Sequence, residues 1–311
     1  MFVASLLTHS YTNMDLVNHL NDRLLFAIPK KGRLYQKAVE ILNGSDIKFR
    51  RSQRLDIALS TNLPVALIFL PAADIPTFVG EGKCDLGITG VDQVREAGID
   101  VELPIDLQFG ACKLQVQVPE NGPYTTPEQL VGKTIVSTFT NLTSQYFAKL
   151  EGVPVEQMST KVKYVGGSVE ASCALGVGDA IVDLVESGET MRAAGLTDIA
   201  TVLDTSAHLI QSRSPKGDPE LIETIKSRIE GVMTAQRYVY CTYNAAKVDL
   251  PTLLAITPGR KAPTLTNVGD DGEWVAVAAM IEKGKKGLIM DELKRAGATD
   301  IIVFDISNCR V

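Results

Sequence analysis

Short apolar runs alternate with amphipathic segments along most of the chain. Runs bounded by turn residues are typical of buried strands, and they cover residues 24–28, 64–70, 114–118, 134–137, 161–165, 180–185 and 199–203. The segments between them predict helices at residues 35–42, 126–130, 145–150, 190–194 and 219–236, with the hydroxyl-rich residues 138–144 as the cap of the third. Strands that alternate with helices indicate an α/β fold.

Two stretches far apart in the chain share one pattern. Residues 85–98 and 179–195 each run from an aspartate through an apolar strand and a glycine loop into a helix that ends at Ala-Gly. This weak internal similarity predicts two similar α/β lobes, with residues 204–210 returning to the first. We expect a ligand to bind in a cleft where the strand ends of two such lobes converge.

The pattern changes near residue 238. Strands are predicted at residues 238–243, 262–267, 274–281 and 299–304, and helices at 250–256 and 287–296. A Gly-Asp-Asp-Gly turn at residues 269–272 joins the second and third strands. The order β-α-β-β-α-β predicts a ferredoxin-like module, which on its pattern alone is a packing or dimerisation domain.

Five segments follow from these patterns. We predict an N-terminal extension (1–21), lobe I (22–115, with 204–218 returning to it), lobe II (116–203), a connecting helix (219–236) and a C-terminal domain (237–311). The first ten residues carry no Lys or Arg, unlike a signal or transit peptide. Met14 offers an alternative start, so the sequence leaves open whether residues 1–13 are translated.

Composition and charge narrow the class of protein. The 311 residues are 45% hydrophobic and 22% charged, as in a soluble globular protein. A net charge of −6 disfavours nucleic acid as a partner, and no apolar run approaches the ~20 residues that span a membrane. The five cysteines are far apart and form no CxxC pair, which is typical of reduced thiols, so we expect a cytoplasmic protein.

The loop after residues 180–185 combines features that bind phosphate. Small and polar residues there lead directly into a helix, so backbone N–H groups, hydroxyls and a helix N-terminus converge. Asp183 lies inside the apolar run, where an unbound carboxylate is costly, and Asp179 precedes it. Both suit the hydroxyls of a phosphorylated sugar. An ordinary strand, capped turn and helix would explain the pattern of the loop equally well.

One stretch resembles the signature of the ATP phosphoribosyltransferase family, which opens histidine biosynthesis. The matching positions are Glu170, Gly176, Gly178, Ile181, Asp183, Leu184, Ser187, Gly188, Thr190 and Met191. The resemblance extends over residues 22–311 and implies a two-lobed, periplasmic-binding-protein-like catalytic core followed by a ferredoxin-like regulatory domain. It implies transfer of phosphoribosyl from 5-phosphoribosyl 1-diphosphate to N1 of ATP, releasing diphosphate.

The resemblance assigns the sugar-phosphate site to the second lobe. It implies that phosphoribosyl diphosphate contacts Glu170, Asp179, Asp183, Ser187, Gly188, Glu189, Thr190 and Met191. Asp183, Glu170 and Arg33 are the expected catalytic residues. None of the three histidines lies in a loop singled out here, and an adenine nitrogen already carries a lone pair. We therefore expect catalysis by orientation and electrostatics, with Mg²⁺ arriving on the diphosphate and no dedicated metal site.

The first lobe carries the expected ATP site. Cations beside a glycine at a strand-to-helix turn suit an anion, although a solvated basic turn is the commoner explanation of such a stretch. The family has Lys-x-Gly-Arg-Leu here, matched by Lys30, Gly32, Arg33 and Leu34. The ATP-binding residues implied by this comparison and by the similarity of the lobes are Lys30, Gly32, Arg33, Arg54, Asp74, Thr89 and Gly90.

The resemblance also implies that histidine binds the C-terminal domain and inhibits the enzyme. The candidate contacts are Asn244, Thr257, Pro258 and Gly259, with Asn244 standing where some relatives carry Asp. Regulation through a terminal domain usually works across subunits, so we expect a homo-hexamer or a dimer.

Two other classes of protein, and one other kind of enzyme, compete with this interpretation. A solute-binding protein would need export, and no signal peptide is visible; a ligand-responsive regulator would need a basic helix-turn-helix, which is also not found. A different phosphoribosyltransferase is disfavoured by the two-lobed order and the C-terminal module. The family signature favours ATP phosphoribosyltransferase.

Overall fold

The computed structural model describes residues 20–51, 55–269 and 272–310. The chain divides into two compact units, one with the residues up to 39 and 48–222, the other with 40–47 and the residues from 223 on. Helix α2 (Gly32–Gly44) contributes to both. Arg54 and most of the predicted N-terminal extension, residues 1–19, lie outside the described residues.

The first unit holds two sheets, which define lobes I and II. Lobe I has the strand order β2-β3-β1-β4-β11-β5. Its strands are β1 (Leu24–Pro29), β2 (Ile57–Leu59), β3 (Val65–Leu70), β4 (Leu86–Gly90), β5 (Glu102–Asp106) and β11 (Ala207–Gln211). Strand β1 pairs in parallel with β3 and β4, and β11 runs antiparallel to β4 and β5. Besides α2, its helices are α3 (Ile75–Gly80) and α4 (Val91–Ala97).

Lobe II has the order β10-β6-β9-β7-β8. Its strands are β6 (Cys112–Pro119), β7 (Thr134–Ser137), β8 (Lys161–Tyr164), β9 (Ala180–Val185) and β10 (Leu196–Thr205). Its helices are α5 (Thr140–Glu151) and α6 (Glu189–Ala193), with single 3-10 turns η1 (Pro127–Leu130), η2 (Val155–Gln157) and η3 (Val169–Ala171). Strand β7 is parallel to β8 and β9, while β6 is antiparallel to β9 and β10.

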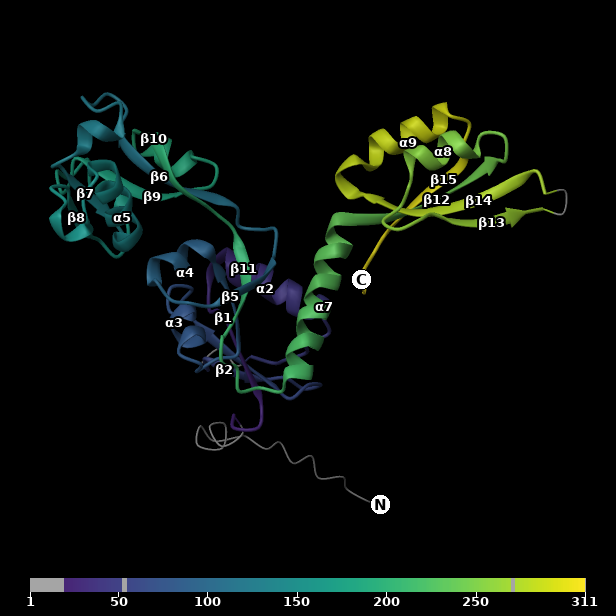
Figure 1. Ribbon diagram of the computed structural model, residues 1–311, viewed down its shortest axis with the longest axis horizontal. Helices are drawn as coiled ribbons and strands as arrows, with labels where there is room; N and C mark the ends of the chain where they lie inside the picture. The colour runs from purple at the N-terminus through teal and green to yellow at the C-terminus, as the bar shows by residue number, and fades with distance from the viewer. Residues whose placement is uncertain (1–19, 52–54, 270–271, 311) are drawn as a thin grey trace, which may run out of the picture. The chain divides into compact units, whose positions relative to one another are not determined.

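The two sheets are built alike. In each, a central strand (β1 or β7) lies between two parallel strands (β3 and β4, or β8 and β9), and an antiparallel strand (β11 or β6) and an edge strand (β5 or β10) follow on one side; lobe I adds β2 on the other. The antiparallel strand of each lobe is entered from the other lobe, so the chain crosses between them twice, along β6 and between β10 and β11 (Figure 1). The predicted similarity of the two lobes is confirmed.

The C-terminal domain is a four-stranded antiparallel sheet of order β13-β14-β12-β15. Its elements are β12 (Tyr238–Ala246), α8 (Leu250–Ile256), β13 (Thr264–Val268), β14 (Trp274–Glu282), η4 (Lys283–Lys285), α9 (Lys286–Arg295) and β15 (Thr299–Asp305). Helices α8 and α9 cover one face of the sheet (Figure 1), where Tyr243, Leu253 and Leu293 pack together. The predicted ferredoxin-like fold is confirmed.

Helix α7 (Pro219–Arg237) precedes this domain. Its buried face carries Ile225, Ile229 and Val232 at helical spacing, as the sequence predicts. Within the same unit Arg228 donates to the carbonyl of Ser45 at 3.4 Å, and Val232 packs on Gly44.

The structure corrects some predicted elements. Helix α5 begins at Thr140 rather than at residue 145, so most of the hydroxyl-rich stretch is helix and not cap. Its first N–H groups are instead bonded by Glu96, a residue 45 positions away. The edge strands β2 and β5 are not predicted, and Glu170 lies in the single 3-10 turn η3. None of the described helices combines the length and hydropathy needed to cross a membrane.

Candidate active site

Strand β9 places Asp183 on the face of the lobe II sheet that η3 and α6 cover. Successive side chains of a strand point to opposite faces. Val182 packs with Phe147 of α5, whereas Ile181 packs with Met191 of α6. Asp183 lies two residues beyond Ile181 and therefore shares its face.

Asp183 is a half-buried carboxyl with a negatively charged neighbour. Its Oδ1 accepts a hydrogen bond from the Leu184 N–H at 2.8 Å, and its carbonyl accepts one from Gln117 Nε2 at 3.3 Å. Burial raises the pKa of Asp183, the Leu184 N–H lowers it, and the charge of Glu170 raises it further. Glu170 comes from η3, so the structure brings these two predicted catalytic residues together.

The loop after β9 exposes polar groups. Gly188 has φ 74° and precedes α6, a backbone conformation that suits glycine. The Ser187 carbonyl accepts from Arg192 Nη2 at 3.0 Å, and its hydroxyl oxygen accepts from the Glu189 N–H at 3.4 Å. The side chains of Ser187, Glu189 and Thr190 are exposed, so they can meet a ligand.

Met191 differs from its neighbours in the loop. Its side chain is 9% exposed and packs with Val136, Val169 and Leu196. The side chain therefore holds α6 against the sheet, and a ligand could contact only its main chain.

Asp179 lies at the other end of β9. Its Oδ2 accepts from the Thr134 N–H at 2.9 Å and its Oδ1 from the Tyr124 hydroxyl at 3.4 Å. At about 3.3 Å per residue, the four residues of strand to Asp183 span about 13 Å. Asp179 therefore supports the start of β7, and we leave it out of the proposed sugar site.

Arg33 reaches from lobe I to lobe II. It lies in the first turn of α2, which begins at Gly32 with φ 81°, and its guanidinium pairs with Glu186. Glu186 directly precedes Ser187, so the structure brings a predicted catalytic cation to the start of the loop after β9. Both partners are exposed, so the pair contributes little to stability and remains open to a ligand.

Lys30 precedes this turn and is half-buried. Its carbonyl accepts from Arg51 Nη1 at 3.2 Å, and Arg51 lies over the Phe69 ring at 3.8 Å. The sequence does not identify Arg51, because nothing in the local pattern distinguishes it from the adjacent Arg50. Arg51 fixes the main chain at Lys30 and leaves the Lys30 amine to other partners.

Thr89 and Gly90 close β4, but the Thr89 hydroxyl is already used. It is fully buried and donates to the carbonyl of Ala72 at 2.8 Å. Gly90 is buried, and a Cβ there would come within 2.1 Å of Asp92 Oδ1. Asp74 precedes α3, is exposed and makes no capping bond. We therefore leave the Thr89 side chain out of the proposed ATP site.

The predicted histidine contacts lie in the C-terminal domain. Asn244 Nδ2 donates to Asp300 Oδ2 at 3.0 Å. Thr257 is fully buried and its hydroxyl bonds the Tyr243 hydroxyl at 2.8 Å, so it supports the end of α8. Pro258 is exposed, and Gly259 has φ 68° in the turn that follows.

Two carboxylates near the lobe crossing are absent from the sequence-based site. Glu186 directly follows β9, and its place beside a phosphate-type loop is the signal that could have identified it. Glu96 bonds the N-terminus of α5, whose own first turn has no acid. Among the residues described here, no three His, Cys, Asp or Glu side chains gather as a metal site.

Comparisons with known proteins agree on one family. A family model for ATP phosphoribosyltransferase matches residues 71–231, and one for the HisG C-terminal domain matches residues 235–308. An ATP phosphoribosyltransferase of Kluyveromyces lactis is 77% identical over 96% of this chain and 100% of its own length. One of Saccharomyces cerevisiae is 74% identical over the same shares.

Among solved structures, the chain resembles an ATP phosphoribosyl transferase (HisG:HisZ) complex from Thermotoga maritima. The TM-score is 0.58 at 22% identity, with 67% of this chain and 96% of that chain covered. At this identity the likeness supports the fold alone.

Proposed function

The chain belongs to the ATP phosphoribosyltransferase family, and we propose that it transfers phosphoribosyl from 5-phosphoribosyl 1-diphosphate to N1 of ATP. It is thus a glycosyltransferase and the first enzyme of the histidine pathway. The proposed products are 1-(5-phosphoribosyl)-ATP and diphosphate, and histidine is the proposed feedback inhibitor.

The proposed step makes one bond and breaks one. The lone pair of adenine N1 forms the bond to ribose C1, while the bond from C1 to the diphosphate oxygen breaks and diphosphate leaves with its electron pair. No base has to remove a proton from the attacking nitrogen. The ribose gains positive character as diphosphate departs, so negative side chains near C1 lower the barrier.

Asp183 and Glu170 are the side chains we propose for this task. Both hold ribose hydroxyls, and their charges face the developing positive centre. A raised carboxyl pKa in the free protein fits such a pair, since two neighbouring carboxylates repel each other until a partner binds between them.

The loop after β9 is the proposed seat of the 5-phosphate. The backbone N–H groups around Gly188 and the hydroxyls of Ser187 and Thr190 are donors for phosphate oxygens. Arg33 and Lys30 meet the diphosphate or the ATP phosphates from lobe I. Gly32, Asp74 and Gly90 remain predicted ATP contacts, and Arg54 remains one outside the described residues.

Mg²⁺ fits this site as an ion carried by the substrate. Asp183 and Glu170 offer hard oxygen donors, but two carboxyls are fewer than a dedicated magnesium cage requires. When bound to the diphosphate, Mg²⁺ would neutralise charge on the leaving group. The carboxyl pair would meet the ion through its coordinated waters.

We propose that histidine inhibits through the C-terminal domain. The Thr257 hydroxyl is bonded to Tyr243, so this turn would contact histidine through the main chain of Pro258 and Gly259. Asn244 is the proposed side-chain contact, and it would have to exchange its bond with Asp300. A homo-hexamer or dimer and a cytoplasmic location remain predictions.

One observation carries the proposal: the Asp183–Glu170 pair lies beside an exposed phosphate-type loop that Arg33 reaches from the other lobe. The test is to mix the full chain with ATP, phosphoribosyl diphosphate and Mg²⁺ and to follow the absorbance of phosphoribosyl-ATP, with and without histidine. Product formation that histidine suppresses supports both parts of the proposal.

Other outcomes separate its parts. Product formation indifferent to histidine keeps the enzyme and removes the regulatory assignment, with Asn244 examined first. A folded protein that forms no product under these conditions contradicts the proposed reaction.

A further inference from the structure

Glu96 joins lobe I to lobe II. It lies near the end of α4, and its carboxylate reaches the first turn of α5. Its Oε1 accepts the Asn141 N–H at 2.9 Å, and its Oε2 accepts the Leu142 N–H at 2.9 Å. Thr140 Oγ1 lies 3.5 Å from Oε1, and Asn141 Nδ2 donates to the Glu96 carbonyl at 3.0 Å.

This carboxylate does what an N-cap residue normally does. The first N–H groups of a helix have no partner within the helix, and a negative charge there is favourable. The residue before α5 is Phe139, which makes no capping bond, and the first turn of α5 has no acid. Lobe II thus starts a twelve-residue helix whose cap is supplied by lobe I.

The bond matters for the site because the site is divided between the lobes. Asp183, Glu170 and the loop after β9 belong to lobe II, whereas Arg33 belongs to lobe I. The polypeptide crossings limit the separation of the lobes but leave their angle to non-covalent contacts. Of those contacts, the Arg33–Glu186 pair is exposed and weak, and the buried bonds between Asp92 and Thr205 lie at the crossing itself, one residue before β11 is reached. Glu96 is half-buried and accepts two well-formed backbone bonds with its charged group.

We propose that Glu96 is a positioning residue, which sets the angle between the lobes so that Arg33 meets the loop after β9 before substrate arrives. The inference rests on the proposed function, because it assumes that substrate bridges Arg33 and this loop. A protein whose lobes are correctly placed only part of the time binds its substrate with an affinity lowered by that fraction. Once substrate has closed the lobes, turnover proceeds as before.

Glu151 provides a matched control. Its carboxylate also accepts two backbone N–H groups, from Ser159 at 2.7 Å and Thr160 at 3.0 Å, but all partners lie in lobe II. Glu96→Gln and Glu151→Gln therefore remove the same kind of interaction, between lobes in one case and within a lobe in the other.

The experiment compares these full-length variants by steady-state kinetics and by amide hydrogen exchange over residues 139–145. For Glu96→Gln we expect a lower Tm, faster exchange there and a KM for phosphoribosyl diphosphate raised about tenfold, with kcat within about twofold. For Glu151→Gln we expect a lower Tm and an unchanged KM.

A double variant separates positioning from capping. Adding Thr140→Asp to Glu96→Gln gives α5 an acid of its own at the N-terminus, which should restore Tm but not KM. Recovery of both Tm and KM in the double variant would make Glu96 a helix cap only. An equal rise of KM in Glu151→Gln would also overturn the proposal, and so would a lowered KM in Glu96→Gln. Unchanged exchange in Glu96→Gln would show that the bond does not form in solution. A wild type without product would refute the proposed function, while exchange would still report on the bond.

Discussion

The turn from β4 to α4 in lobe I, made by Thr89 and Gly90, and the loop after β9 in lobe II occupy equivalent places in two similarly ordered sheets. Each lies at the end of the strand between the central parallel strand and the antiparallel strand, has a glycine beside a hydroxyl residue and leads into a short helix, α4 or α6. From topology and sequence pattern, either loop qualifies as an anion site.

Their polar groups have different partners. In lobe I the Thr89 hydroxyl is bonded to Ala72, and the buried Asp92 carboxylate accepts from Thr205 Oγ1 at 2.8 Å. In lobe II the side chains of Ser187 and Thr190 are exposed. Topology thus determines where an anion site can form. Which of the two loops can bind an anion depends on whether its polar side chains are exposed or already bonded within the fold.

The largest expected effect comes from Asp183→Asn. We expect kcat to fall about 100-fold, because the variant removes the charge that we propose faces the developing positive centre. Tm should not fall, since burial already favours the neutral carboxyl that Asn resembles. Rates of phosphoribosyl-ATP formation and thermal unfolding of the same samples measure both quantities.

Asp92→Asn is the matched control at the β4 end, where Asp92 of lobe I is bonded to Thr205 of the lobe II strand β10. Thr205 Oγ1 and Gln93 Nε2 donate to different oxygens of Asp92, and Asn can accept at only one of them. We expect a lower Tm with kcat within about threefold of the wild type. A loss of turnover as large as that of Asp183→Asn would contradict the distinction between the loops.

Removing one hydroxyl from each loop tests the comparison directly. We expect Thr190→Val to raise KM for phosphoribosyl diphosphate about tenfold and to leave Tm unchanged, since the hydroxyl is exposed and is one of the proposed phosphate donors. Thr89→Val should destabilise the fold by about 1–2 kcal/mol, because the Ala72 carbonyl loses its donor in a buried place. Its KM should change less than twofold. Denaturant titration and initial rates give these values, and the reverse pattern would exchange the roles of the loops.

Sequence reasoning succeeds where the signal is local. Strand β9, strand β7 and helix α8 have the predicted bounds, because each is a short periodic run between turn residues. The helix predicted at residues 126–130 is a 3-10 turn, Pro127–Leu130, with Thr126 at its N-cap. The sequence does not predict the edge strand β5, because Pro104 and the acids Glu102 and Asp106 interrupt the apolar pattern of a strand.

It fails where the partner of a polar group lies far along the chain. The sequence predicts Thr89 as a ligand contact, but its hydroxyl donates to the Ala72 carbonyl. It predicts Asp179 as a sugar contact, but its carboxylate accepts from the Thr134 N–H. The start of α5 was misplaced because its cap comes from Glu96 in the other lobe. No local pattern contains these pairings, so a candidate site read from sequence includes residues that the fold has already used.

Acid titration should separate site carboxyls from structural ones by sign. The pKa of Asp183 is raised by burial, so its contribution to stability is full below the ordinary aspartate value of about 3.9 and is lost as the pH rises through the higher folded value. The pKa of Glu151 is lowered to about 2 by the Thr160 hydroxyl and the Ser159 N–H. Its contribution is present above about 4.3 and is lost as the pH falls towards 2.

Tm measured against pH checks both signs. Asp183→Asn should gain stability relative to the wild type between pH 4 and pH 7, whereas Glu151→Gln should be less stable than the wild type at pH 7 and approach it towards pH 2. If instead the Tm of the wild type rose relative to that of Asp183→Asn as the pH increased, the Asp183 carboxylate would be stabilised within the fold, like that of Glu151. That result would weaken the assignment of Asp183 to the site.

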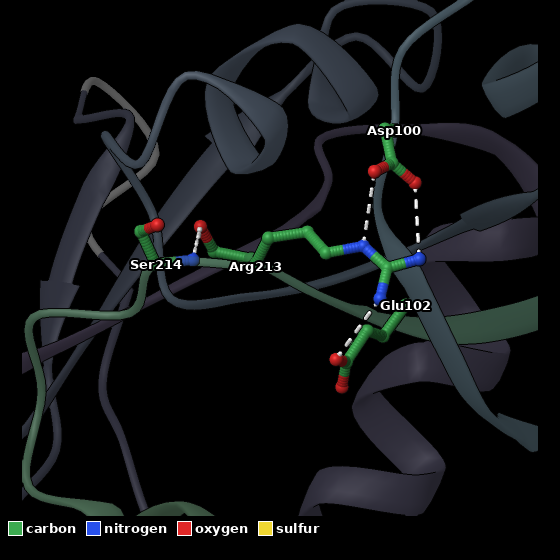
Figure 2. A network of polar contacts seen from close by, with 5 residues as sticks. Asp100, Glu102, Arg213 and Ser214 are labelled. Carbon is green, nitrogen blue, oxygen red and sulfur yellow. Dashed lines mark hydrogen bonds and ion pairs between the residues drawn. The ribbon is translucent and has the colours of Figure 1, made fainter.

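The smallest effect is expected at the far end of the lobe I sheet. Arg213 follows β11, whose Gln211 pairs with Leu86 at the start of β4, away from the loop that closes this strand. Arg213 Nε and Nη2 both lie 3.1 Å from Asp100 oxygens, and Nη1 lies 3.3 Å from Glu102 (Figure 2). These bonds raise the pKa of Arg213, but all three side chains are largely exposed to solvent.

We therefore expect Arg213→Gln to shift Tm by less than about 2 °C, and by less still at high salt, because water and ions screen exposed pairs. KM and kcat should stay at wild-type values, since neither loop touches this network. Arg213 binds Asp100 through two nitrogens (Figure 2), so a small effect here beside the large effect of Asp183→Asn would show that function depends on position at the strand ends and not on the quality of an ion pair. An altered KM in Arg213→Gln would mean that the β4 end of the sheet is coupled to its opposite edge, and the comparison between the two loops would then have to include the whole of lobe I.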